Sequence, residues 1–346
     1  MLRYTLRRLS FLPIILFAVS ILVFVLLRVL PAGDIADVIG GSNATPEQKG
    51  TIRERYGLSD AIFPVTIPGQ CETLIWYVPK CTIDSPVLEF HRHSQYGSWL
   101  GNALRGDFGT EFTNNASVRA DFVRRFPASF ELVALALGFS VVFGISFGIL
   151  SAMYRNSLLD YGVRMFAVLG TSIPEFFLLT LLIVIPSYLW NYAQPAGGYV
   201  PIYREPVTNL RLFLPPALIM GVAGSSGLMR LVCTTMLEVL RADYVRTARS
   251  KGLTTRAVVL SHALRNAGTP ILTAVGTAFI AVFGGSVVAE RILSIQGIGQ
   301  FFFLSAFARD LPVIQFLAVY TAAVVVLVNL VVDLSYAWAD PRVKYT

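Results

Sequence analysis

Six stretches of about twenty mostly apolar residues divide this chain of 346 residues. A helix needs about 20 such residues to cross the hydrocarbon core of a bilayer, so each stretch is predicted to form one membrane-spanning helix. Proline and glycine interrupt the third and fourth stretches, which membrane helices tolerate where neighbouring helices satisfy the freed backbone groups. The predicted spans are, approximately, Leu9–Leu30, Phe130–Met153, Val163–Trp190, Leu212–Val232, Ile271–Ala289 and Val313–Tyr336.

The composition of the chain supports this membrane assignment. Apolar residues make up 55% of it and charged residues only 14%, whereas a soluble domain carries about 25% charged residues. A water-soluble globule and a disordered chain are therefore both excluded. The first apolar run is longer than the roughly 7–15 apolar residues of a cleaved signal peptide, so we expect it to remain as the first span.

The basic residues give the chain an orientation, because cytoplasmic loops carry an excess of Lys and Arg. With six spans, all four basic clusters fall on one side, which we predict to be the cytoplasm and to hold both termini. The formal net charge of +7 then indicates loops that face anionic lipid, and no nucleic-acid partner. The clusters are Arg3, Arg7 and Arg8; Arg155 and Arg164; Arg241, Arg246, Arg249, Lys251, Arg256 and Arg265; and Arg342 and Lys344.

This orientation divides the chain into four predicted regions. Residues 1–30 hold the cytoplasmic N-terminus and the first span, and residues 31–129 form one long extracytoplasmic loop. Residues 130–336 form a core of five spans with a cytoplasmic hairpin, and residues 337–346 form a cytoplasmic tail. The expected fold class is an all-α polytopic membrane protein with six transmembrane helices.

Two of the three cysteines lie in the long loop. Cys71 and Cys81 are on the predicted outer side, where an oxidising environment permits a disulfide between them; two unpaired thiols are the alternative. Cys233, at the cytoplasmic end of the fourth span, is expected to be a reduced structural residue. His91 and His93 in the same loop are too few ligands for a metal ion, so no metal site is predicted.

The sequence lacks the motifs of several common enzyme classes. It has no P-loop, no H-E-x-x-H and no G-x-S-x-G pattern, so we predict neither a catalytic site nor a cofactor in this chain. Proton- or ion-driven carriers usually place ionisable groups near the middle of their spans. Glu175 is the one acidic residue in the middle of a predicted span, and we interpret it as a packing or cavity residue in preference to a proton relay.

Small residues four positions apart form a stripe along the second predicted span. Such a stripe lets two helix backbones approach closely, and we expect packing within the subunit in preference to a dimer contact. The stripe consists of Ala136, Ser140, Gly144, Gly148 and Ala152.

The most informative segment is the polar, basic stretch 236–270 between the fourth and fifth spans. It is longer than an ordinary helix–helix connection of about 2–8 residues. We predict two short helices, the first of which ends near Lys251. Gly252 then suits the left-handed position that follows a helix C-terminus, because glycine has no Cβ to clash there.

The second short helix of this hairpin has start and stop signals of its own. Thr254 or Thr255 is expected to cap its N-terminus, and Gly268 and Pro270 are expected to end it before the fifth span. A long, ordered, basic hairpin on the cytoplasmic face indicates docking to a cytoplasmic partner.

The hairpin resembles the coupling loop of bacterial ABC-importer permeases. Their general pattern is Glu-Ala-Ala, three residues, Gly, nine residues, then Ile-x-Leu-Pro, and Ala248, Gly252 and Leu264 match it. Its departures from that pattern, at Arg246, Thr247, His262 and Arg265, agree with the version in the dipeptide, oligopeptide and nickel branch. In this chain that version is Met236-Leu237-Glu238, Asp243-Tyr244-Val245-Arg246-Thr247-Ala248-Arg249, Lys251-Gly252-Leu253, His262-Ala263-Leu264-Arg265-Asn266-Ala267 and Pro270.

The resemblance to this branch extends over nearly the whole chain. One of the matching segments departs from the family at Gln296, where proline is usual. The matching segments are the opening Leu2-Arg3-Tyr4, Pro31-Ala32-Gly33-Asp34, Gly106-Asp107-Phe108-Gly109, Phe126-Pro127-Ala128-Ser129, Ile295-Gln296-Gly297-Ile298-Gly299 and Asn329-Leu330-Val331-Val332-Asp333-Leu334.

The resemblance implies a type I ABC-importer permease in the bacterial cytoplasmic (inner) membrane, with no catalytic site of its own. The implied partners are a second homologous permease subunit, two cytoplasmic ATPase subunits that bind ATP and Mg²⁺, and an extracytoplasmic solute-binding protein. Two such permeases enclose the pathway, and ATP-driven closure of the ATPases draws the two hairpins together. The implied substrate is a dipeptide or oligopeptide; nickel chelates or another small solute are the alternatives.

Twelve residues of the hairpin are the predicted ATPase-coupling site. They are Asp243, Tyr244, Arg246, Thr247, Ala248, Arg249, Lys251, Gly252, Leu253, His262, Leu264 and Arg265. The residues that line a substrate pathway stay unassigned. An independent secondary carrier is the competing function from a different class.

Overall fold

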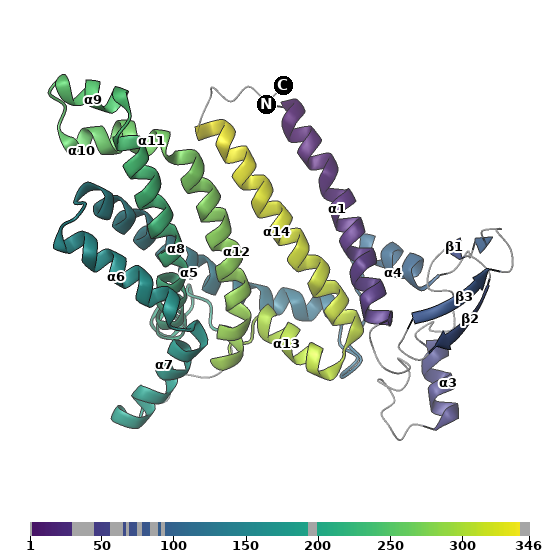
Figure 1. Ribbon diagram of the computed structural model, residues 1–346. Coiled ribbons are helices and arrows are strands. Elements are labelled where there is room, and N and C mark those ends of the chain that lie inside the picture. Colours follow the sequence, from purple (N-terminus) through teal and green to yellow (C-terminus); the bar gives the residue numbers. More distant parts are fainter. Residues whose placement is uncertain are drawn as a thin grey trace. The chain divides into compact units, whose positions relative to one another are not determined.

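The structure is a computed structural model (Figure 1). It describes residues 2–29, 45–55, 65–66, 69–74, 78–83, 89–90, 94–192 and 199–339, and the side chains of residues 9–27, 45–54, 94–192 and 199–336. The chain divides into two compact units. Unit 1 comprises residues 1–15, 122–304 and 321–346, and unit 2 comprises residues 16–121 and 305–320.

Helices make up most of the described chain. In order they are α1 (Leu2–Val29), α3 (Pro46–Arg55), α4 (Gln95–Leu104), α5 (Val118–Met153), α6 (Leu158–Ser172), α7 (Glu175–Trp190), α8 (Pro206–Leu240), α9 (Asp243–Ser250), α10 (Thr255–Ala257), the π-helical segment η1 (Val258–Ala263), α11 (Leu264–Asn266), α12 (Gly268–Ile292), α13 (Ile298–Ala308) and α14 (Leu311–Ala339).

Five of the described helices, α1, α5, α8, α12 and α14, are individually long and apolar enough to cross a membrane. The third predicted span, about Val163–Trp190, consists of two helices, α6 and α7, bent by 89° at a short break. The break has a local cause. Ile173 precedes Pro174 and adopts an extended conformation, with φ −90° and ψ 120°, because the proline ring disfavours a helical residue before it. The prediction of a helical polytopic membrane protein is thus confirmed, with five span-length helices among the described residues and a sixth span if α6 and α7 are counted together.

The long predicted loop adds short strands to this helical fold. β1 (Val65–Thr66) pairs with β4 (Glu89–Phe90), and β2 (Gly69–Leu74) pairs with β3 (Val78–Ile83), both in antiparallel orientation. The strands are four short additions to a membrane domain that is otherwise helical. The last part of the stretch 31–129 is also helical, since α5 begins at Val118.

The small-residue stripe of α5 packs against α8 inside unit 1, as the sequence predicts. A methyl group on Gly144 would lie 2.6 Å from a side-chain carbon of Leu228, and one on Gly148 would lie 2.7 Å from Val232. Ala152 belongs to the same buried cluster as Val232. Glycine is therefore required at these crossings, because any Cβ would force the two helices apart.

Unit 2 is held by aromatic and polar contacts around Tyr96. The Tyr96 ring lies 5.2 Å from that of Phe24, edge to face, and its hydroxyl is 2.8 Å from the Ser20 hydroxyl. Asp310, which precedes α14, accepts hydrogen bonds from the Phe112 backbone N–H at 2.8 Å and from the Thr113 hydroxyl at 3.2 Å. The loop before α5 is thereby fastened to the turn before α14.

Three carboxyl groups meet at this fastening point in unit 2. Glu111, Asp121 and Asp310 are all buried. The pKa of Glu111 is raised to about 7, chiefly by burial. A hydrogen bond with Asp121 and charge repulsion from Asp121 and Asp310 raise it further, while a hydrogen bond with Asn114 lowers it. Glu111 is therefore partly protonated near neutral pH.

Candidate functional site

The predicted coupling hairpin forms a helical unit at one end of α8 and α12 (Figure 1). α8 runs as far as Leu240, and the turn at Arg241–Ala242 separates it from α9. The first arm of the hairpin is thus the end of a membrane helix followed by a separate short helix. This division is not evident from the sequence, because no proline or glycine marks it.

Gly252 adopts the left-handed conformation that the sequence predicts, with φ +80°. The Leu253 N–H donates to the Ala248 carbonyl at 3.4 Å, and the Gly252 N–H donates to the Arg249 carbonyl at 2.9 Å. These two bonds form a Schellman motif, which satisfies carbonyls at the end of α9. The turn is therefore fixed by backbone geometry.

The second arm begins at the predicted cap and then departs from the prediction. The Thr254 side chain accepts a hydrogen bond from the Ala257 N–H at 3.4 Å, as expected for an N-cap. The arm then passes through the π-helical segment η1, which the sequence does not signal. The arm ends at Asn266, just before the fifth span, as expected, but Gly268 and Pro270 belong to that span and not to the break. α12 begins at Gly268, and Pro270 lies in its first turn, where the missing N–H of proline costs no helical hydrogen bond.

The buried side of the hairpin joins its two arms and attaches them to the membrane helices. Val245 and Ala248 of α9 pack with Val258 in one buried cluster. A second cluster joins Val259, Ala263 and Ala267 to Val232 and Met236 of α8 and to Ile271 and Ala274 of α12. The hairpin is therefore packed continuously against the ends of α8 and α12.

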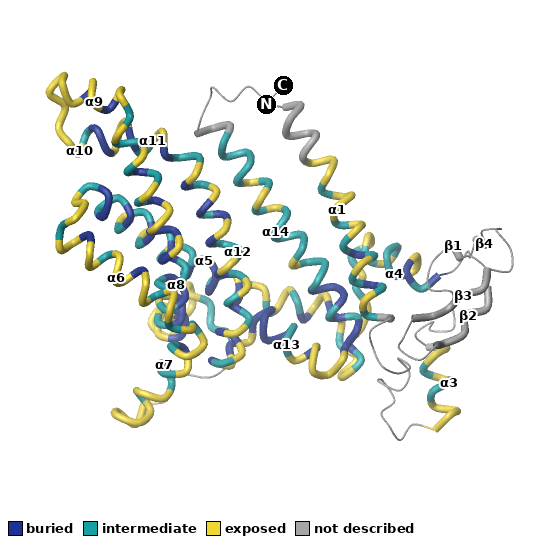
Figure 2. Tube along the Cα trace, viewed as in Figure 1, coloured by how far each residue is buried: buried dark blue, intermediate teal, exposed yellow. Residues whose placement is uncertain are grey.

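Many residues of the hairpin are exposed (Figure 2), and several of these are basic. The hairpin also carries three large apolar side chains with exposed fractions of 42% to 50%, namely Tyr244, Leu253 and Leu260. Leu260 was not among the predicted site residues, although it lies two positions before His262 in the same arm of the hairpin. The exposed cations are Arg241, Arg246, Arg249, Lys251, Arg256 and Arg265.

Most of the predicted coupling residues are exposed. Ala248 is buried and Leu264 is partly buried, so these two support the arms and do not present a contact surface. The Arg246 guanidinium lies 3.9 Å from the Asp243 carboxylate. Both side chains are highly exposed, and such ion pairs contribute little to stability. The charges therefore remain available to a partner.

A buried carboxylate organises the turn between α12 and α13 at the far end of α12. Glu290 Oε1 accepts a hydrogen bond from the Ser129 hydroxyl at 2.6 Å, and Oε2 accepts one from the Gln300 N–H at 2.9 Å. The Ser129 oxygen in turn accepts from the Ile298 N–H at 2.7 Å. A Cβ on Gly297 would overlap the Glu290 carboxylate and the Ser129 hydroxyl. The segment 295–299 thus needs glycine to fit around Glu290.

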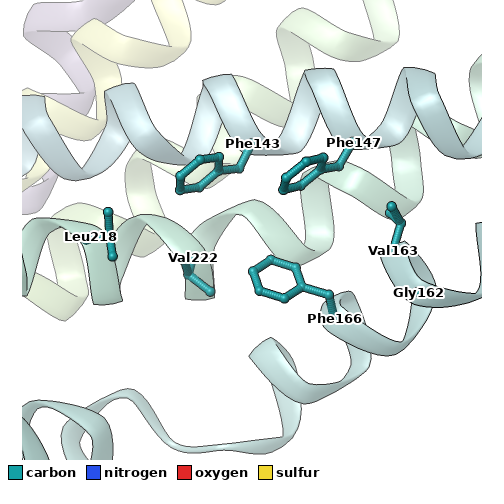
Figure 3. Close-up of a pocket in the computed structure, with 7 residues that line it drawn as sticks. All are labelled: Phe143, Phe147, Gly162, Val163, Phe166, Leu218 and Val222. Atoms are coloured by element: carbon teal, nitrogen blue, oxygen red, sulfur yellow. The ribbon is translucent and has the colours of Figure 1, made fainter. Parts of the chain in front are cut away.

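An apolar cavity of about 400 Å³ lies between α5, α6 and α8. Figure 3 shows Phe143 and Phe147 of α5 facing Phe166 of α6 across it. The remaining lining residues are Gly162, Val163, Leu218 and Val222. This lining carries no polar side chain to recognise a solute. Among the described residues, no group of three or more His, Cys, Asp or Glu side chains is arranged to hold a metal ion.

The register of the β2–β3 hairpin sets Cys71 directly opposite Cys81. Directly opposed residues in an antiparallel pair have Cα atoms about 4.5–5.5 Å apart, within the range that a disulfide bridges. Their side chains, like those of His91 and His93, lie outside the described residues. The disulfide stays a prediction.

Comparison with known families places this architecture in a class of membrane proteins. The family model described as "binding-protein-dependent transport system inner membrane component" matches residues 144–345, and the corresponding N-terminal model matches residues 1–67. The chain therefore belongs to this family and is a multi-pass membrane permease of the ABC-importer type. Family membership favours the importer over an independent secondary carrier.

The similar proteins narrow the class to the peptide-permease branch. A putative peptide transport system permease of Brucella abortus (strain 2308) is 35% identical over 331 residues, covering 96% of this chain and 95% of that protein. The oligopeptide permease AppB of Bacillus subtilis is 32% identical over 346 residues, covering 99% of both. The di/tripeptide permease DppB of Pseudomonas aeruginosa is 32% identical over 364 residues, covering 100% of this chain and 99% of that protein.

Among solved structures, a chain of the MetNI methionine ABC transporter in an inward-facing conformation aligns with 64% of this chain and 96% of its own length. The TM-score is 0.48 and the sequence identity is 18%.

Proposed function

We propose that this chain forms half of the translocation pathway of a peptide importer and couples it to ATPase subunits through the hairpin 236–270. The names of the similar proteins support a dipeptide or oligopeptide as the substrate. The observation that carries the coupling role is the set of exposed apolar and basic side chains of the hairpin. Exposed apolar side chains accompanied by polar and arginine side chains are a common composition of protein docking surfaces.

The assembly proposed around the chain has four kinds of partner. A second homologous permease completes the pathway, two cytoplasmic ATPase subunits bind ATP and Mg²⁺, and an extracytoplasmic binding protein delivers the solute. The chain itself contributes no catalytic group and holds no cofactor in this proposal. Both termini and the hairpin are cytoplasmic in the inner membrane, and residues 31–129 lie outside.

The proposed mechanism is rigid-body transmission. Movement of a docked ATPase displaces the exposed residues of the hairpin. The cluster of Val259, Ala263 and Ala267 with Met236 and Ile271 then carries α8 and α12 along, because a packed interface moves as a unit. At the other end of α12, Glu290 fastens the helix to Ser129 of α5 and to the start of α13. The displacement thus reaches the α12–α13 turn.

The test is reconstitution of the chain with the proposed second permease, ATPase subunits and binding protein. The proposal predicts that the ATPases co-purify, that the binding protein carries a peptide, and that peptide uptake into proteoliposomes requires ATP. Failure of the ATPases to co-purify contradicts the coupling role. A non-peptide ligand on the binding protein contradicts the substrate and leaves the coupling role standing.

A further inference from the structure

Glu175 lies at the 89° break between α6 and α7, as the first residue of α7. Its carboxylate rests against the backbone of α12. A methyl group on Gly285 would lie 3.1 Å from each of the two carboxylate oxygens. The neighbouring Gly284 is open, since nothing lies within 4 Å of the position that a methyl group would occupy there. The carboxylate therefore occupies the space that a side chain at position 285 would need.

This carboxylate is unpartnered within the described part of the chain. Its Oε1 atom is buried and accepts no hydrogen bond there, and no described cation forms an ion pair with it. Glu290 of α12 has the opposite hydrogen-bonding situation, because both of its carboxylate oxygens accept hydrogen bonds from the protein. The described part of the chain therefore supplies donors to the Glu290 carboxylate and none to that of Glu175.

Glu175 lies in the apolar stretch predicted as the third span and packs against α12, a helix long and apolar enough to cross a membrane. Gly285 stands seven residues before the end of α12 at Ile292, which is about 10 Å along a helix. Acidic groups in membrane-spanning segments are costly and mostly face a cavity or a functional partner. A broken helix is likewise tolerated at membrane depth where it is covered by protein or lines a water-filled space.

We propose that Glu175 binds the cationic group of the solute as it crosses, and that on a peptide this group is the free α-ammonium. The proposal rests on the proposed peptide-import function. An ammonium group offers three donors and no acceptor, which complements a carboxylate that has no donor among the described residues. An anionic solute, such as a negatively charged metal chelate, would be repelled at the same point.

A purely structural role for Glu175 makes a different prediction. An acidic residue in the first turn stabilises its own helix through the helix dipole, and α7 begins at Glu175. That role affects every solute equally. A binding role affects a solute only if it carries the cation.

The test compares two probes, L-alanyl-L-alanine and its N-acetyl derivative, in proteoliposomes that contain the complete complex with saturating binding protein. Because the binding protein is the same throughout, differences between variants report on the permease. We expect Glu175→Gln to lower kcat/KM for the free dipeptide at least tenfold, to leave the N-acetyl derivative unchanged, and to leave complex assembly intact. Glu175→Asp, which keeps the charge, should recover most of the uptake.

Glu131→Gln is the matched control, since Glu131 is another carboxyl group of a membrane helix and its Oε1 atom also accepts no hydrogen bond within the described residues, but the group has a protein partner in Tyr199. It should leave the ratio between the two probes as in the wild type. Equal loss of both probes in Glu175→Gln, or no loss of either, overturns the proposal. If the binding protein carries a different, cationic solute and its uptake falls in Glu175→Gln, the peptide assignment fails and Glu175 keeps its role. If the binding protein carries an anionic or uncharged solute, both the peptide assignment and the proposed role of Glu175 are overturned.

Discussion

Substitution of Gly252 tests the coupling hairpin through backbone conformation alone. The residue has φ +80° and nothing lies within 4 Å of the position that a Cβ would occupy. A new side chain therefore meets no steric obstacle within the chain, and its cost is conformational. A non-glycine residue in the left-handed region costs roughly 1–2 kcal/mol, which is about a 5- to 30-fold change in the population of the native turn.

The cost should depend on the backbone preference of the substituent. Asparagine enters the left-handed region most readily among non-glycine residues, alanine less so, and valine least because it is β-branched. We expect peptide transport per ATP hydrolysed to fall in the order Gly252, Gly252→Asn, Gly252→Ala, Gly252→Val, with the alanine variant reduced by no more than about 30-fold. Gly252→Arg adds a large side chain to the docking surface and should uncouple transport from hydrolysis while the complex still assembles.

The assay measures uptake and ATP hydrolysis in the same proteoliposomes, and co-purification of the ATPases reports assembly. Gly101→Ala is the matched control, because Gly101 also has open space around it but lies within α4 at an ordinary helical φ. The control should transport as the wild type does. Wild-type coupling in Gly252→Val, or a loss that is as large for asparagine as for valine, would refute the conformational argument.

Three further predictions concern other parts of the chain. Burial and Asp121 raise the pKa of Glu111 from 4.5 to about 7, so protonation of Glu111 stabilises the folded state. The free energy of unfolding should therefore fall as pH rises from 4.5 to 7. Melting curves at pH 5.5 and 8 should show a smaller difference for Glu111→Gln than for the wild type. Cys71 and Cys81 should both resist alkylation without reductant, as intact-mass analysis would show, and free labelling of both would reject the disulfide. Glu290→Gln turns one hydrogen-bond acceptor into a donor that faces other donors, and should cost about 1–3 kcal/mol; an unchanged melting temperature would contradict the described contacts.

The sequence predicts the spans well because membrane burial requires long apolar runs, whatever the tertiary contacts are. It does not show where a run breaks. Pro174 and Pro186 both interrupt the third run, yet only Pro174 ends a helix there, while Pro186 lies inside α7. Tertiary packing decides whether a proline ends a helix or is accommodated within it, and the pattern of a single sequence does not reveal that packing.

The hairpin was predictable where one residue decides the local geometry and not elsewhere. Gly252 and Thr254 follow from backbone conformation and capping chemistry. Gly268 illustrates the opposite case, because a glycine that ends a short helix and one that begins a long helix look alike in sequence. The partners of Glu290, and the lack of one at Glu175 among the described residues, depend on residues far apart in the chain, so only the folded structure reveals them.

Site-specific photo-cross-linking from the hairpin to the ATPase tests the central claim most directly. A photoreactive residue would replace Leu253 or Leu260, both exposed in the hairpin, with Leu104, which is 81% exposed in α4, as the control position. The account predicts an adduct with the ATPase subunit from both hairpin positions and none from Leu104. An adduct from Leu104, or the lack of one from both hairpin positions in a transport-competent complex, would contradict it.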